Sequence, residues 1–369
     1  ARGIVSQSRA GRSRCRSDPF TGVPVAVDAA SSIRRRHRLR PELSPRCAGT
    51  DTASLWKAAA GSGRSCDRGA MTRSRPLPAH LGTSFSVEQA RAAGIDAGRL
   101  RRGDLVTPFR GVRTKLRAPA DHGDLDPFER QRLERRIRAY EYGPRLRANQ
   151  FLSHESAVAV WGGPMPLELA EGRPADGRSL DVHVSTLGAG PLVRAPGVRA
   201  HRLRSPAARL VRTRGLTVAS PEVTFAGLGT WDLIDLVALG DYFCRVWRVG
   251  HGRPSSGKTP YSTVERLRDA VELGRRVGAA RLRQAIDLIR EDSWSARESI
   301  LRCRMVWAGL PEPELNVDVY DDDDGRFLAC VDLAYPARKV AIEYQGMLHA
   351  GRYAEDVERI AALRAAGWT

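Results

Sequence analysis

The sequence predicts an α+β protein built from several domains. Apolar residues recur at helical spacing in stretches such as 263–272 and 279–290. Other stretches, such as "ELNVDVY" and "VAIEYQG", are short, rich in valine and alternate in polarity as strands do. The chain has 369 residues and 42% hydrophobic content, enough for more than one packed core.

Residues 1–70 lack any sustained hydrophobic period and are strongly basic. They hold 14 Lys/Arg and 5 Asp/Glu, a net charge of +9, which is half of the +18 of the whole chain. We expect a disordered basic leader or a mis-assigned start, because "MTRSRPLPAHLG" from Met71 has the character of a natural beginning. The alternative is a basic arm that binds nucleic acid.

The rest of the composition predicts a cytoplasmic protein. Cys244, Cys303 and Cys330 are widely spaced and form no C-x-x-C pair, so neither a zinc knuckle nor a disulfide framework is indicated. The longest apolar stretch, "FAGLGTWDLIDLVALG", is too short for a membrane span and contains two aspartates. No hydrophobic signal-peptide segment precedes it.

Residues 71–120 predict a winged helix-turn-helix that contacts double-stranded DNA. A helix over 87–93, capped by Ser86, is followed by a turn at Gly94, a second helix over 96–102 capped by Asp96, and two strand-like pieces. Arginines concentrate on the second helix and the wing, where phosphates would lie. The candidate DNA-binding residues are Arg99, Arg101, Arg102, Arg110 and Arg113. The alternative is a small solvated helical hairpin.

Residues 121–290 predict a mixed α/β middle module without evident reaction chemistry. Its first helix, within 121–150, is expected to bury Phe128, Leu133, Ile137 and Tyr140. Strands over "SLDVHVST" and "VRAHRLR" and several helices follow. The pair His154-Glu155 opens one of these helices, and we interpret it as capping and packing.

Residues 291–369 predict the order helix, three strands, helix. Side-chain alternation puts Asp332 of the second strand and Glu343 of the third on one face if the turn "YPAR" pairs Ala334 with Lys339. Glu343 is then the diagonal neighbour of Asp332, about 7–8 Å away at Cα. Two carboxylates at this separation can share one hard cation such as Mg²⁺.

This pattern resembles the restriction-endonuclease-like PD-(D/E)XK fold, in its helix, three strands and helix with Asp332 before "EYQ". It is more narrowly similar to very-short-patch-repair-like domains of actinobacterial proteins, through "VDLAYP...VAIEYQGMLH...D..R...L...GW". Such proteins often begin with a winged helix similar to that of AbiEi-type antitoxins, and the stretch 85–114 resembles such a segment. The resemblance implies an αβββα core that here lacks its final strand after Thr369.

The resemblance also implies roles for individual residues. Asp332 and Glu343 would bind Mg²⁺, and Glu298 would be the helix acid that completes the site. Gln345 stands where this fold commonly has a lysine, and His349 would transfer a proton. The implied catalytic set is Asp332, Glu343, Gln345, His349 and Glu298.

Several interpretations are open at this stage. Glu298 could instead form a capping box with Ser295, and the sheet acids could be solvated positions on an open face. The protein would be a Mg²⁺-dependent endonuclease acting on DNA. The alternative is a transcriptional regulator or antitoxin-like protein with a degenerate, non-cutting domain, acting as a homodimer or with a toxin partner. A third possibility is an inert genomic remnant.

Overall fold

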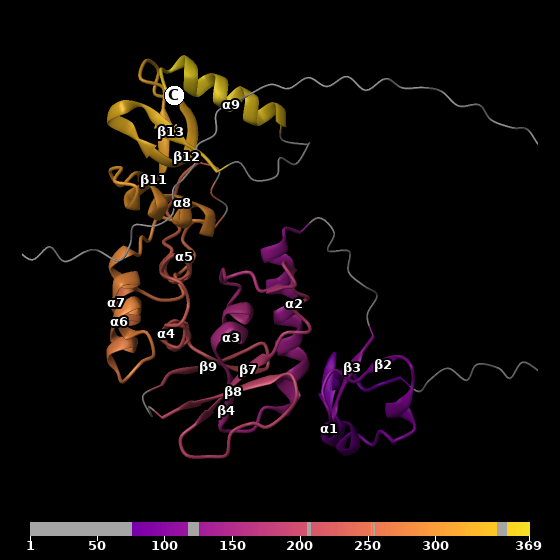
Figure 1. Cartoon of the computed structure of the whole chain (residues 1–369). Coiled ribbons are helices and arrows are strands. Elements are labelled where there is room, and N and C mark those ends of the chain that lie inside the picture. The colour runs from indigo at the N-terminus through magenta and orange to yellow at the C-terminus, as the bar shows by residue number, and fades with distance from the viewer. Residues whose placement is uncertain (1–75, 117–124, 205–207, 252, 254, 345–352) are drawn as a thin grey trace, which may run out of the picture. The chain divides into compact units, whose positions relative to one another are not determined.

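The computed structural model describes residues 76–116, 125–204, 208–251, 253, 255–344 and 353–369 (Figure 1). The chain divides into two units, Ala1–Ala70 and Met71–Thr369, and all described residues belong to the second. Helices and several β-sheets alternate along this unit, so the protein is α+β. Among the described residues, none of the helices combines the length and apolar character that a membrane crossing requires.

The segment that begins the described chain folds around a small three-stranded sheet of order β1-β3-β2. Its elements are the 3₁₀ turn η1 (Ala79–Leu81), β1 (Ser84–Ser86), α1 (Val87–Ala92), the 3₁₀ turn η2 (Arg99–Arg101), β2 (Leu105–Val106) and β3 (Val112–Lys115). Ser86 caps α1 in a capping box with Gln89, and serine is a favoured residue at this N-cap position. The expected helix over 96–102 is only the 3₁₀ turn η2, because Gly98 and Gly103 flank it with residues of low helix propensity.

A five-stranded mixed sheet forms the centre of the middle region, in the order β8-β7-β4-β10-β9. β7 is parallel to β8 and β4 is parallel to β10, while β4 with β7 and β9 with β10 are antiparallel. Its strands are β4 (Gln150–Leu152), β7 (Val182–Leu187), β8 (Val198–Leu203), β9 (Leu210–Thr213) and β10 (Leu216–Ala219). The helices α2 (Pro127–Tyr142) and α3 (His154–Trp161) pack on it through a shared apolar core. The short η3 (Gly143–Arg145) and the hairpin of β5 (Leu169–Ala170) and β6 (Arg173–Pro174) complete this region.

Helix α2 buries a different face from the one that its apolar residues predicted. Phe128 is 44% exposed, whereas Gln131 and Arg135 are buried. The Gln131 side-chain amide donates to the carbonyl oxygens of Glu168 and Ala175, both at 2.9 Å. A buried amide with satisfied hydrogen bonds costs little, so the polar face can pack inward.

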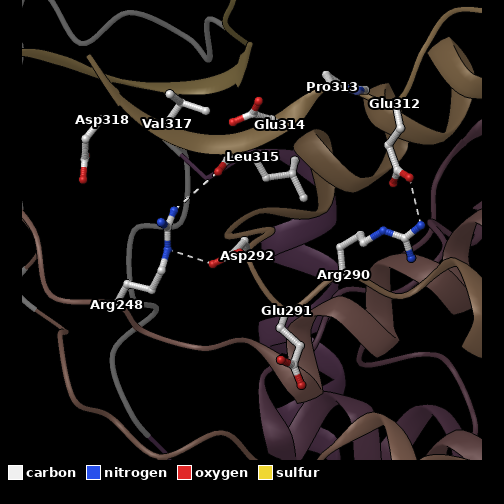
Figure 2. Close-up of a pocket in the computed structure, with 10 residues that line it drawn as sticks. All are labelled: Arg248, Arg290, Glu291, Asp292, Glu312, Pro313, Glu314, Leu315, Val317 and Asp318. Carbon is white, nitrogen blue, oxygen red and sulfur yellow. Dashed lines mark hydrogen bonds and ion pairs between the residues drawn. The ribbon is translucent and has the colours of Figure 1, made fainter. Parts of the chain in front are cut away.

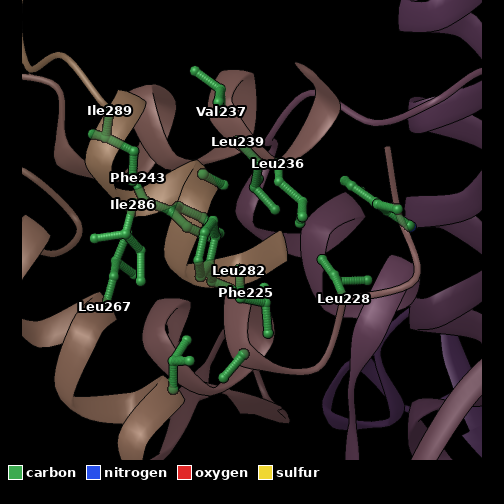
Figure 3. Packing of buried hydrophobic residues seen from close by; sticks show 14 of the residues in the cluster. Phe225, Leu228, Leu236, Val237, Leu239, Phe243, Leu267, Leu282, Ile286 and Ile289 are labelled. Carbon is green, nitrogen blue, oxygen red and sulfur yellow. The ribbon is translucent and has the colours of Figure 1, made fainter. Parts of the chain in front are cut away.

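A second apolar core lies among short helices that follow the sheet (Figure 3). These helices are α4 (Pro221–Ala226), α5 (Leu233–Cys244), α6 (Val264–Glu272) and α7 (Ala279–Leu288). Phe225, Phe243 and Leu282 are fully buried in this core. Cys303 of α8 (Ala296–Trp307) belongs to the same cluster, so α8 packs on the helical region as well as on the sheet that follows it.

The last region is an antiparallel sheet of order β11-β12-β13, with α8 before it and α9 (Tyr353–Ala365) after it. Its strands are β11 (Glu314–Tyr320), β12 (Phe327–Tyr335) and β13 (Val340–Ile342). Leu363 of α9 packs on Val319 and Val331 in a third core. The element order predicted for this region is therefore the one that the structure has.

The β12–β13 hairpin corrects the expected register by two residues. Ala334 pairs with Ala341 rather than with Lys339, and the turn consists of η4 (Pro336–Arg338) and Lys339, one residue later than "YPAR". A shift of two residues leaves every side chain on its predicted face, because side chains in a strand alternate with a period of two.

The backbone of Thr369 lies along the outer edge of β13. Thr369 N donates to the Lys339 carbonyl oxygen and Ala341 N donates to the Thr369 carbonyl oxygen, both at 2.8 Å. These two bonds have the pattern of a parallel bridge.

Candidate functional site

Three of the acids singled out in the sequence lie around the C-terminal sheet. Glu298 is in the first turn of α8, Asp332 is in β12, and Glu343 directly follows β13. Extending the β12–β13 register by one residue puts Asp332 opposite Glu343, closer than the predicted diagonal arrangement. Glu298 is 5% exposed, and the other two are half-buried.

The charge of Asp332 affects the ionisation of the other two carboxylates. Burial raises the pKa of Asp332, and the N–H of Tyr344, which donates to Asp332 Oδ2 at 3.0 Å, opposes that rise. Burial also raises the pKa of Glu298 and of Glu343, and the charge of Asp332 raises both further. Partly desolvated acids that repel each other in this way are typical of a site that receives a cation.

Glu298 is held by hydrogen bonds from two sides. Its N–H donates to Ser295 Oγ at 3.2 Å, and its Oε2 accepts from the N–H of Trp294 at 2.9 Å, one residue before the N-cap. Oε2 also accepts from Asn316 Nδ2 at 2.8 Å. Only the Ser295 half of the expected capping box is present, because the Glu298 carboxylate accepts from Trp294 rather than from the N–H of Ser295. Glu298 therefore stabilises the start of α8 and also lies close enough to Asp332 to feel its charge.

Asn316 was not recognised in the sequence. It lies in β11 between Leu315 and Val317, which pair with Leu333 and Val331, so it faces Asp332 across the ladder. Its φ of 49° is left-handed, a conformation that asparagine tolerates better than most residues. This conformation accompanies the amide's bonds to Glu298 and to the Asp292 carbonyl oxygen at 2.6 Å. Asn-Val within an alternating strand carries no sequence signal for such a bend.

Arg359 of α9 donates to both carboxylate oxygens of Glu343, from Nη1 to Oε1 at 2.5 Å and from Nη2 to Oε2 at 2.7 Å. It also contacts Asp356 at 3.3 Å, as residues three apart on one face of a helix can. The guanidinium is the charge that opposes the rise in the pKa of Glu343. The D-x-x-R spacing in the sequence was the one signal that could have placed this arginine at the site.

Two residues of the implied catalytic set cannot be placed in the cluster or outside it. Gln345 and His349 lie outside the described residues. Lys339, at the end of the β12–β13 turn, binds Asp322 at 2.7 Å and the Ala366 carbonyl oxygen at 2.9 Å. It therefore joins the β11–β12 turn to the end of α9.

The candidate DNA-binding arginines separate into two groups. Arg99 is 7% exposed and forms a two-pronged ion pair with Asp104 at 2.9 and 2.7 Å, which corrects its expected place on an open surface. Arg113 donates to the carbonyl oxygens of Leu100 and Val112, both at 2.8 Å. The other three, Arg101, Arg102 and Arg110, are exposed. Arg99 and Arg113 hold the segment together because it has little apolar core of its own.

A pocket of about 530 Å³ lies along β11, and none of the three acids lines it. Figure 2 shows Arg248 between Asp292, at 2.8 Å, and the Leu315 carbonyl oxygen, at 3.4 Å. On another side of the pocket Arg290 pairs with Glu312 at 2.9 Å. Arg248 and Arg290 each neutralise one carboxylate of the lining, and the carboxylates of Glu291 and Glu314 line the pocket as well.

Carboxylate oxygens at Asp332, Glu343 and Glu298 are the donor set that Mg²⁺ prefers in proteins. The set fits a hard cation in chemical type, and Arg359 now supplies a positive charge to Glu343.

Comparison of the chain with protein-family models, with curated proteins and with solved structures gave no match.

Proposed function

We propose that the protein binds DNA and that residues 291–369 form a Mg²⁺-dependent endonuclease that hydrolyses phosphodiester bonds. The observation that carries this proposal is the position of Asp332 and Glu343 opposite each other on neighbouring strands, where the charge of Asp332 raises the pKa of Glu343. Partly burying two neighbouring carboxylates costs free energy, and a cation bound between them would offset that cost.

The acids of this site are oriented by neighbours, which is what a metal site needs. The Tyr344 N–H orients Asp332, the Asn316 amide orients Glu298, and Arg359 orients Glu343. Asp332 and Glu343 would hold the ion, with Glu298 as a further ligand or as a partner of bound water. When bound, Mg²⁺ polarises a phosphate oxygen and lowers the pKa of a bound water.

Arg297, which lies over the ring of Tyr344, is a candidate phosphate contact at the edge of the site. Arg297 Nη1 donates to Tyr344 Oη at 2.9 Å, and its guanidinium carbon lies 5.0 Å from the ring centroid. Arg297 is exposed and precedes Glu298 on α8. An exposed arginine next to a carboxylate cluster suits a polyanionic substrate better than a small acidic metabolite.

The bidentate bond from Arg359 to Glu343 favours a second candidate, a DNA-binding regulator whose nuclease-like site does not cut. A guanidinium that neutralises Glu343 takes over part of the role of the cation. In this alternative the exposed Arg101, Arg102 and Arg110 bind duplex DNA, and the C-terminal region only supports the fold.

Plasmid nicking with Mg²⁺ or Mn²⁺ separates the two candidates. The full chain should relax supercoiled plasmid, and Glu343→Gln and Asp332→Asn should each reduce the rate by more than about 100-fold, since one ionised ligand is lost. Asp323→Asn is the matched control, because Asp323 is an exposed aspartate of the β11–β12 turn.

Two results would overturn the nuclease. One is nicking that persists in both variants, which would assign it to a contaminant. The other is wild-type protein that binds duplex DNA in a salt-sensitive manner and never cuts it, which is the result that the regulator predicts. In that case removing Arg101 or Arg102 should lower the salt dependence by about one phosphate contact each.

A further inference from the structure

Three histidines gather between α3 and the five-stranded sheet. His154 is the first residue of α3, His183 is in β7 and His201 is in β8. One ring nitrogen from each lies within 4.8 Å of the corresponding nitrogens of the other two. His201 Nε2 is 3.1 Å from His183 Nδ1, and the rings of His154 and His201 stack with centroids 3.7 Å apart.

The sheet and the helix start bring these residues together. β7 and β8 are parallel, and His201 pairs with Ser185, two residues after His183, so the two histidines share one face of the sheet. Ser153, the N-cap of α3, donates its N–H to the His183 carbonyl oxygen at 3.1 Å. This bond fixes the start of α3 above the two strands.

The sequence predicted capping and packing for the pair His154-Glu155, and His154 does pack, against the rings of His183 and His201. Ser153 makes no side-chain capping bond, and its Oγ instead lies 3.0 Å from His154 Nδ1. The φ of His154 is 48°, a left-handed value that costs of order 1 kcal/mol or more outside glycine. The contact with Ser153 occupies Nδ1 of His154, so Nε2 is the ring nitrogen left to bind a metal.

Glu155 adds a carboxylate to the group, beside the ring of His183. Its Oε1 accepts from Trp231 Nε1 at 3.2 Å. Its Oε2 is buried and lies 2.7 Å from His183 Nδ1, yet among the described residues no N–H or O–H is aligned to donate to it. A buried acceptor left in this state is costly, and a cation beside it would remove the cost.

We propose that His154, His183 and His201, with Glu155, bind a zinc ion. Three imidazole nitrogens and one carboxylate oxygen are a common donor type for Zn²⁺ and a poor one for Mg²⁺. Tetrahedral ligation at about 2.0–2.1 Å places ligand nitrogens about 3.3 Å apart, close to the His183–His201 separation.

The site has a route for the ion to enter. His183 is 6% exposed, but His154 and His201 are half-buried and reach the surface. Because these two rings are stacked, zinc binding must tilt one of them so that both lone pairs point at the ion. Bound zinc would fasten the start of α3 to β7 and β8, independently of the carboxylates near β12.

Metal binding to the full chain tests this site directly. After removal of metal by a chelator, the protein should bind Zn²⁺ in competition with a chromophoric chelator, and Co²⁺ should give the visible bands of tetrahedral ligation without thiolate charge transfer. His154→Gln and His201→Gln should each weaken zinc binding by more than about 100-fold, since changes outside the ligand set alone cost about 10–100-fold. His80→Gln, at an exposed histidine away from the cluster, should bind as wild type does.

A second measurement does not depend on the folding of the variants. Zinc at about 100 times its dissociation constant should raise the melting temperature of the wild-type protein by about 5 °C or more. The proposal is overturned if wild-type protein shows neither zinc binding nor this shift. It is equally overturned if His154→Gln and His201→Gln bind zinc as wild type does, or if Co²⁺ shows thiolate bands, which would place the metal among cysteines.

Discussion

Removing the guanidinium of Arg302 should destabilise the protein in a strongly pH-dependent way. Arg302 of α8 and Asp241 of α5 are each 1% exposed, and Arg302 Nη2 lies 3.3 Å from Asp241 Oδ2. The same nitrogen donates to the Leu288 carbonyl oxygen at 2.8 Å. Arg302→Met keeps much of the side-chain length but leaves Asp241 buried without its counter-ion.

The stability lost in Arg302→Met depends on whether Asp241 stays ionised or takes up a proton when its counter-ion is removed. If it stays ionised, breaking a buried pair from one side costs about 3–5 kcal/mol. If it takes up a proton, the cost at pH 7 is about 4.4 kcal/mol for a carboxyl with an ordinary pKa of 3.8, at about 1.36 kcal/mol per pH unit. At pH 5 this second route costs only about 1.6 kcal/mol.

Burial raises the pKa of Asp241 already in the wild-type protein, and loss of Arg302 raises it further. For a raised carboxyl pKa, the favourable contribution is present below the unfolded value and is lost as pH rises through the folded value. The loss of stability in Arg302→Met is therefore about 4 kcal/mol at pH 7 and below about 2 kcal/mol at pH 5.

Urea unfolding of the full chain, followed by tryptophan fluorescence at the two pH values, measures this difference. The double variant Arg302→Met with Asp241→Asn is the control, since it removes both charges and should recover most of the stability. A loss below about 1 kcal/mol at pH 7, or an equal loss at both pH values, would contradict an unpaired buried charge as the cause.

Three further predictions concern single residues. Burial, followed by the charge of a neighbouring carboxylate, raises the pKa of Asp235 to about 6. Asp235→Asn should therefore stabilise the fold by about 1–2 kcal/mol at pH 7, after allowance for solvent screening, and not at pH 4; thermal melts that show the same gain at both values would refute this. Gly278 has φ 69° and a Cβ there would lie 1.9 Å from a backbone oxygen, so Gly278→Ala should cost about 3 kcal/mol or more in urea unfolding, whereas Gly274→Ala, which meets nothing within 4 Å, should cost less than about 1 kcal/mol. Arg359→Met should free Glu343 and raise Mn²⁺ affinity about 3- to 10-fold in a spin-resonance titration, as expected for loss of about 1 kcal/mol of competing ion pair; unchanged affinity would argue against a cation there.

Local patterns in the sequence were enough to predict the kind and order of most elements. Serine before a helical period marked the starts of α1 and α8, where Ser86 and Ser295 accept backbone N–H bonds. Alternation along β12 and toward Glu343 was enough to put Asp332 and Glu343 on one side, because a two-residue error in register does not change a side chain's face. Both signals involve residues a few positions apart, where backbone geometry alone decides the outcome.

Contacts between distant residues decided the rest. Three features each depend on a partner that the local sequence pattern does not reveal. They are the left-handed conformation of Asn316, the bidentate bond from Arg359 to Glu343 and the buried position of Arg99. The grouping of His154, His183 and His201 likewise needs two parallel strands and a helix start to meet. The sequence by itself determined the α+β class and the acids of the C-terminal sheet, because these follow from periodicity. Only the tertiary structure decided which polar side chains meet, because buried polar groups pair with whatever partner the folded backbone brings within reach.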